Sequence, residues 1–216
     1  IIWKSRVPQA LTAMVAGAGL AVSGLQMQTV FRNPLAGPSV LGISSGASLG
    51  VAFVVLLSGS IGGIALSRLG FMGEIALTMA AIIGALSIMA LIVYVSQKVH
   101  GNVTLLIIGV MIGYVANAVI GVLKFFSVEE DIRAYVIWGL GSFARVSGNQ
   151  MMVFVCIMAV LLPLSFLLIK TLNLLLLGDA YARNLGLNIK RARLQVIACS
   201  GVLVAIVTAY CGPITF

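Results

Sequence analysis

The stretch Val7–Phe31 reads VPQALTAMVAGAGLAVSGLQMQTVF and contains no Lys, Arg, Asp or Glu. About 20 apolar residues are enough to cross a bilayer as a helix. Backbone groups in hydrocarbon must find hydrogen-bond partners within the segment, which a helix provides. A membrane β-strand would instead alternate apolar and polar residues over about ten positions. The stretch is continuously apolar and therefore predicts a transmembrane helix.

The composition supports a membrane protein. Hydrophobic residues make up 61% of the chain and charged residues only 8%, whereas a soluble domain is roughly one quarter charged. The 13 Lys and Arg against 5 Asp and Glu give a net charge of +8. In a soluble protein this excess would suggest nucleic acid. Here it is attributed to basic loops at the membrane surface, and no nucleic-acid partner is expected.

Four further segments lack charged residues and are each long enough for one span: 75–97, 99–123, 146–169 and 194–216. A sixth span is predicted at 40–57, after a loop interrupted by Pro34 and Pro38. Within it, Gly42, Gly46 and Gly50 recur every four residues, a spacing that lets a neighbouring helix approach closely. The predicted fold is an all-α, polytopic transmembrane bundle of six spans in a single domain, 1–216.

Two polar connections separate these spans. The segment 127–150 mixes acidic and aromatic residues, which is typical of a helix at a membrane interface. The segment 173–193 is the longest polar connection. Within it, 179–185 is predicted to form a short helix capped by Asp179 and ended by Gly186.

The loops of six spans alternate between two sides of the membrane, and the basic residues divide almost evenly. One side holds Arg32, Lys98, Lys170, Arg183, Lys190, Arg191 and Arg193, and the other holds Lys4, Arg6, Arg68, Lys124, Arg133 and Arg145. The cluster at 190–193 favours a cytoplasmic location for the first side.

No cofactor or metal site is expected. His100 is the single histidine, and Cys156, Cys199 and Cys211 show no CxxC spacing. No GK[ST] motif for ATP phosphates is present. Lys124 lies near a span end, from which its side chain can reach the interface.

Several ordered segments are not generic membrane sequence. They are RVP from Arg6, GAGLAVSGLQMQ at 17–28, RNPLA at 32–36, PSVLGISSGA at 38–47, WGLGS at 138–142, LGDAYARNLG at 177–186 and GPITF at 212–216. Together they closely resemble the FecCD-type permeases of bacterial ABC importers, which take up iron–siderophores, haem and cobalamin. The resemblance covers the whole chain in one register.

The resemblance implies a multi-pass protein of the bacterial inner membrane with about ten spans. This chain matches the second to the seventh, so we expect it to be a piece that lacks the first span and the last three. The implied assembly is a homodimer with two ATPase subunits, which hydrolyse the ATP, and a periplasmic substrate-binding protein. The chain itself is then not an enzyme. Segments 40–57 and 103–126 are candidates for lining the path of a metal chelate.

The resemblance also implies roles for individual residues. The cytoplasmic coupling loop, 173–193, would contact the ATPase through Leu177, Gly178, Asp179, Ala182, Arg183, Leu185 and Gly186. The cytoplasmic gate of the pathway would include Asn33, Leu35, Val103 and Thr104. Arg6, with Lys4, would dock the binding protein, although Gln9 replaces a second arginine of that pattern. From the residues alone, Arg6 also fits a simple interface anchor, and Asn33 fits an ordinary turn.

Two other classes of function remain open from the residues. A gradient-driven secondary transporter or channel would place carboxylates or broken helices at membrane depth. The second class is a non-transport scaffold or a membrane enzyme. A membrane enzyme would need a nucleophile or an acid–base pair. A requirement for an ATPase partner separates the importer from both. The motifs leave open whether a siderophore, haem or cobalamin is carried.

Overall fold

The computed structural model describes residues 6–62, 71–99, 102–146 and 148–214, and every regular element in these ranges is a helix. In chain order they are α1 (Val7–Phe31), η2 (Pro38–Leu41), α2 (Ile43–Gly62), α3 (Phe71–Lys98), α4 (Asn102–Phe125), α5 (Glu129–Gly139), η4 (Phe143–Arg145), α6 (Asn149–Phe166), α7 (Ile169–Leu176), α8 (Asp179–Asn184) and α9 (Ile189–Cys211). Lys4, Arg68 and His100 lie outside the described residues. The predicted all-α bundle is confirmed.

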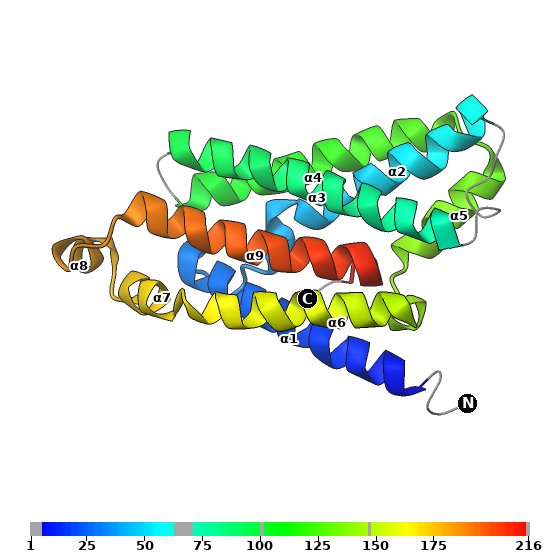
Figure 1. Cartoon of the computed structure of the whole chain (residues 1–216). Helices are drawn as coiled ribbons and strands as arrows, with labels where there is room; N and C mark the ends of the chain where they lie inside the picture. The colour runs from blue at the N-terminus through cyan, green and yellow to red at the C-terminus, as the bar shows by residue number, and fades with distance from the viewer. Residues whose placement is uncertain (1–5, 63–70, 100–101, 147, 215–216) are drawn as a thin grey trace.

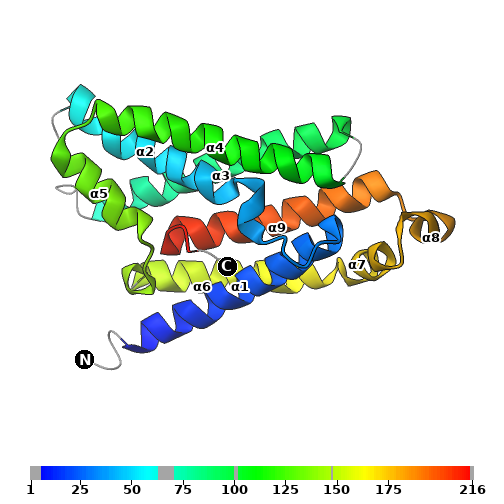
Figure 2. The same cartoon turned by 180° about the vertical axis from the view of Figure 1, so that it is seen from behind.

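Within the described residues, five helices (α1, α3, α4, α6 and α9) are long and apolar enough to cross a membrane, and α2 adds a shorter apolar helix over Ile43–Leu57. The long helices run alongside one another in both views (Figures 1 and 2). In α9, 61% of the apolar window is buried, against 17% in α6. This difference makes α9 the central helix, because it packs against α1, α2, α3 and α6.

The ends of α1 follow from its sequence. Pro8 lies in the first turn, where its missing N–H costs no hydrogen bond. The helix ends at Arg32, which adopts the left-handed conformation with φ 49° and donates its backbone N–H to the Gln28 carbonyl. Pro34, two residues later, cannot continue the helix. The predicted span Val7–Phe31 is therefore confirmed at both ends.

The start of the next span differs from the prediction. Val40 lies in η2, and α2 begins only at Ile43, because Gly42 has φ +71° and interrupts the helical path. The three glycines predicted to lie on one helix face therefore contact two different helices. Gly42 packs on α4, whereas Gly46 and Gly50 pack on α3. The expected close helix approach is confirmed, but for two different helix pairs.

The predicted polar connection 173–193 is mostly helical. The span predicted at 146–169 ends at Phe166, where the N–H groups of Leu167 and Leu168 bond back three residues in a tight turn. A new amphipathic helix, α7, then begins at Ile169 and buries Leu172 and Leu175. The last span starts at Ile189, five residues before the predicted position, because the Asn188 side chain caps α9 by accepting from the Arg191 N–H at 3.2 Å.

The two groups of loops lie at opposite ends of the bundle. Figure 1 shows α8, the end of α1, the end of α3 and the start of α4 at one end. The start of α1 and the α5 helix lie at the other. This arrangement agrees with the sides assigned from the sequence. The helix predicted within 127–150 is α5, and three acidic residues lie in its first turn.

Candidate functional site

The short helix α8 is fixed by the backbone on both sides. Gly178, with φ +105°, begins it, and Gly186, with φ +85°, ends it. The Leu187 N–H donates to the Ala182 carbonyl at 2.9 Å and the Gly186 N–H to that of Arg183 at 2.9 Å. These two bonds satisfy carbonyl groups at the C-terminal end of α8, as is typical of a helix that ends at a glycine. The Ala182 side chain is fully buried, so α8 is a compact element anchored to the bundle.

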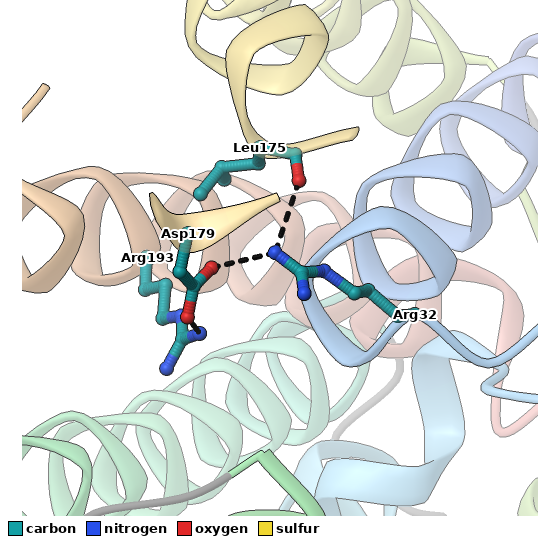
Figure 3. A network of polar contacts seen from close by, with 4 residues as sticks. All are labelled: Arg32, Leu175, Asp179 and Arg193. Carbon is teal, nitrogen blue, oxygen red and sulfur yellow. Dashed lines mark hydrogen bonds and ion pairs between the residues drawn. The ribbon is translucent and has the colours of Figure 1, made fainter. Parts of the chain in front are cut away.

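The prediction that Asp179 caps α8 is wrong. The capping position is Gly178, which makes no side-chain cap, and Asp179 is the first helical residue. Its carboxylate instead accepts hydrogen bonds from Arg32 and Arg193, each at 2.6 Å (Figure 3). Hydrogen bonds between two ionised groups are stronger than a bond to a neutral backbone N–H. The carboxylate is therefore oriented toward the bundle by the two guanidinium groups.

Three large side chains on and beside α8 remain exposed. The exposed fractions are 61% for Leu177, 70% for Tyr181 and 62% for Leu185. Two of them belong to the predicted coupling set, and Tyr181 was not predicted. Clustered exposed apolar side chains of this size are typical of a protein contact surface. We refer to Leu177, Tyr181 and Leu185 as the α8 apolar surface.

A cavity of about 510 Å³ lies beside α8 at the same end of the bundle. It is lined by Val30, Phe31, Arg32, Ser96, Val99, Val103, Leu105, Asp179, Arg183, Ile189, Lys190, Arg193 and Ile197. Four of these residues are basic and one is acidic, so the cavity is electropositive above an apolar floor. Within the described ranges, no ion pair is recorded for Arg183 or Lys190.

The four predicted gate residues have different surroundings. Val103 lines the cavity together with Arg32, although its side chain is 70% exposed. The Asn33 side-chain oxygen accepts the Leu35 N–H at 2.9 Å, a local turn contact. Leu35 is 87% exposed, and Thr104 is exposed as well. Asn33, Leu35 and Thr104 are not among the residues that line this cavity.

The predicted docking residue Arg6 is exposed at the start of α1. Figure 1 shows this end of α1 far along the bundle from α8. The two predicted contact regions therefore lie at opposite ends of the molecule, as partners on opposite sides of a membrane require. Lys4, the second predicted docking residue, lies outside the described residues.

Comparison with known families gives a match over the full length. The model of the FecCD transport family covers residues 1–216. The chain belongs to the FecCD transport family. The resemblance inferred from the ordered motifs is thus confirmed.

Individual relatives agree with this assignment. The chain is 36% identical to the hemin transport system permease protein HmuU of Yersinia pestis, over 100% of this chain and 63% of that protein. It is 34% identical to the vitamin B12 import system permease protein BtuC of Pectobacterium atrosepticum, over 100% of this chain and 62% of that protein. The chain spans slightly less than two thirds of the length of these relatives.

A solved structure shows the same fold. It is a metal-chelate type ABC transporter in an inward-facing conformation, with a TM-score of 0.81 and 31% sequence identity. The match covers 98% of this chain and 65% of that one. The helical arrangement described above is therefore shared with this transporter.

Two FecCD motifs pack against each other at the end of the bundle opposite α8. The backbone N–H of Ser142, in the segment 138–142, donates to the Cys211 carbonyl at 2.8 Å. Gly141 and Gly212 both have positive φ angles and lie in backbone contact. The two motifs, distant in the chain, therefore meet in the folded protein.

Arg145 lies in η4, directly after this junction, and its guanidinium group lies over the Trp138 ring. Burial lowers the pKa of this guanidinium group, and the nearby Glu74 carboxylate opposes the shift.

Sequence reasoning missed the partners of Asp179. The sequence places Arg32 and Arg193 on the same side of the membrane as Asp179, but it does not predict that they pair with its carboxylate. Arg32 is separated from Asp179 by 147 positions. The available signal was the scarcity of acids, since Asp179 is the single acidic residue in the segment 173–193.

Proposed function

We propose that this chain forms the core of the membrane-spanning permease subunit of an ATP-binding-cassette importer in the bacterial inner membrane. The subunit acts as a homodimer with two ATPase subunits and a periplasmic substrate-binding protein. Its substrate is a metal chelate of the iron–siderophore, haem or cobalamin type. The ATPase subunits hydrolyse ATP, and the permease contributes the path and its gates by alternating access.

The observation that carries this proposal is the geometry of α8. A helix that transmits motion must be rigid in itself, anchored to the bundle and accessible to a partner. Gly178 and Gly186 fix its ends, buried Ala182 anchors it, and the α8 apolar surface remains exposed. These three properties suit a helix that is seated in a cleft of an ATPase subunit.

The path for the substrate is proposed along the exposed face of α4 and the start of α2. A groove there is lined by Ser45 of α2 together with Tyr114 and Asn117 of α4. Tyr114 is 71% exposed, although the helix around it is apolar. A second copy of the permease facing this surface would enclose a passage with hydroxyl and amide groups but without fixed charges. A large amphiphilic chelate can pass such a wall without being trapped by a fixed charge.

The test uses the full-length permease, reconstituted in liposomes with its ATPase and binding protein. We expect Tyr181→Ala and Leu185→Ala to weaken ATPase binding and to reduce both ATP hydrolysis and uptake. The matched control is Leu167→Ala, which shortens another exposed leucine at the turn between α6 and α7. Equal ATPase binding in all variants would refute α8 as the docking helix.

The energy source distinguishes the proposed importer from the alternative, a gradient-driven transporter or channel. We expect uptake to require ATP and to persist when ion gradients are dissipated. Uptake that follows an ion gradient without the ATPase subunits would replace the importer with this alternative. Parallel assays with an iron–siderophore, haem and cobalamin identify which chelate the binding protein delivers.

A further inference from the structure

Asp179 joins α8 to α1, which is distant in the chain, and to α9, which follows α8. Arg32 at the end of α1 binds Oδ1 of the carboxylate, and Arg193 in α9 binds Oδ2, each through Nη2 at 2.6 Å (Figure 3). Each oxygen is thus held by one guanidinium group. We refer to Arg32, Asp179 and Arg193 as the cytoplasmic triad. It connects the first residue of α8 to the helices on either side of it.

Arg32 makes a second contact that extends the connection. The same Nη2 atom also donates to the carbonyl of Leu175, near the end of α7, at 3.3 Å. Arg32 is the one non-glycine residue with a positive φ in the described ranges. Such a conformation persists where the surrounding contacts determine it. The side chain of Arg32 therefore spans from α1 to both helices of the coupling loop.

The residues that follow Arg32 form the predicted gate loop. The Gln28 side-chain amide donates to the Pro34 carbonyl at 3.0 Å, and Asn33 accepts the Leu35 N–H. These two bonds stiffen the loop directly after Arg32. A displacement of Asp179 that preserves its pairing with Arg32 would consequently shift the loop as well.

Charge makes this pairing necessary. The side chains of the triad are between 24% and 44% exposed, so water screens them only in part. The same cavity also contains Arg183 and Lys190. Without the Asp179 carboxylate, the four basic residues would line this cavity with no acid among its lining residues. Loss of this charge is therefore expected to separate the segments, beyond the loss of two hydrogen bonds.

We propose that the cytoplasmic triad is a positioning device that makes α8 and the gate loop 32–36 move as one unit. This proposal rests on the proposed function, because it assigns a route by which ATP-driven movement of α8 reaches the pathway. The three residues act through other groups and do not themselves contact the substrate. The α8 apolar surface binds the ATPase, whereas the triad transmits the resulting movement.

The first experiment measures the substrate transported per ATP hydrolysed by the full-length complex in liposomes. For Asp179→Asn we expect this ratio to fall about fivefold or more, the change that corresponds to a coupling free energy of about 1 kcal/mol. Arg32→Gln should behave alike, and Arg32→Gln combined with Asp179→Asn should be no worse than either alone. Asp179→Glu, which keeps the charge, should recover most of the ratio.

The matched control is Lys190→Gln, which removes a charge from the same cavity without breaking a recorded ion pair. Its ratio should equal that of the wild type. A wild-type ratio in Asp179→Asn would overturn the triad proposal while leaving the importer intact. If the wild-type complex shows no ATP-dependent uptake, the proposed function itself fails.

A second measurement does not depend on transport. Spin labels at Leu35 and Asn184, both exposed, report the distance between the gate loop and α8. With ATP and without it, the wild type should keep the same narrow distribution for the distance between the two labels of one subunit, because the two segments move together. Asp179→Asn should broaden it. An equally narrow distribution in this variant would contradict the triad proposal, even if the variant transported poorly.

Discussion

Gly84 of α3 lies directly against Gly50 of α2, so that a Cβ atom at Gly84 would come within 2.9 Å of both the N and the Cα of Gly50. Real Cβ atoms essentially never approach backbone this closely, so either helix would have to move. A Cβ at Gly50 would likewise clash with the backbone carbonyl of Ala80. The two helices are thus in contact through their backbones.

This contact predicts that Gly50→Ala destabilises the protein. Overpacking in a close-packed interior costs roughly 1–3 kcal/mol, which should appear as a lower unfolding temperature of the full-length permease in detergent. Gly17→Ala in α1 is the matched control, because a Cβ there meets no atom within 4 Å. An unchanged unfolding temperature for Gly50→Ala would contradict the backbone contact between α2 and α3.

The spans could be predicted from the sequence because a charge in lipid is costly, so each charge-free segment had to be a helix. The boundaries of α2 and α9 could not. Gly42 leaves the helical conformation, and Asn188 caps α9 ahead of its basic residues. The first boundary is set by a backbone angle and the second by a side-chain cap, and hydropathy reports neither. The pairing of Arg32 with Asp179 depends on tertiary packing and has no periodic signal in the chain.

Gly141 is expected to be intolerant of a side chain because two requirements coincide there. Its φ is +67°, and a Cβ would lie 3.0 Å from Ile214 and 3.3 Å from the Cys211 carbonyl. The left-handed conformation alone costs other residues roughly 1–2 kcal/mol. We therefore predict that Gly141→Ala lowers the unfolding temperature, whereas Gly139→Ala, which meets no atom within 4 Å, does not. Equal effects of the two would show that the motif junction is not packed as described.

Ser23 and Ser200 link α1 to the central helix. Their hydroxyl oxygens are 2.5 Å apart, both side chains are buried, and each hydroxyl also lies 3.3 Å from the other residue's carbonyl oxygen. Hydrogen bonds between membrane helices contribute about 0.6 kcal/mol on average and up to about 1.7 kcal/mol. We predict a loss in this range for Ser23→Ala.

A double-mutant cycle tests this link, since Ser23→Ala and Ser200→Ala together should cost less than the sum of the two. Ser165→Ala is the control, because in the part of the chain that the structure describes its buried hydroxyl bonds only within its own turn, to the Leu162 carbonyl at 2.6 Å. That change should be independent of Ser200→Ala. Strict additivity between Ser23 and Ser200 would disprove the link between the two helices.

Asp131 predicts an unusual dependence of stability on pH. Its side chain is buried at the start of α5, and one of its oxygens, Oδ2, has no hydrogen-bond partner among the described residues. Burial raises the pKa of this carboxyl above its ordinary value, and the neighbouring Glu130 raises it further. The folded protein therefore binds the proton more tightly than the unfolded chain does. The protonated Asp131 carboxyl therefore contributes to stability fully at pH values below its pKa in the unfolded chain. This contribution is lost as the pH rises through its pKa in the folded protein.

Asp131→Asn removes the charge that is unfavourable in the folded state. We expect this variant of the full-length permease to unfold at a higher temperature than the wild type at pH 7, with the difference shrinking as the pH falls toward 4. Glu129→Gln removes the same charge from an exposed position in the same turn. Because an acidic group there favours the helix dipole, this control should be neutral or slightly less stable. If Asp131→Asn lowered the unfolding temperature at pH 7, the carboxylate would have to be stabilised by a partner in the folded protein.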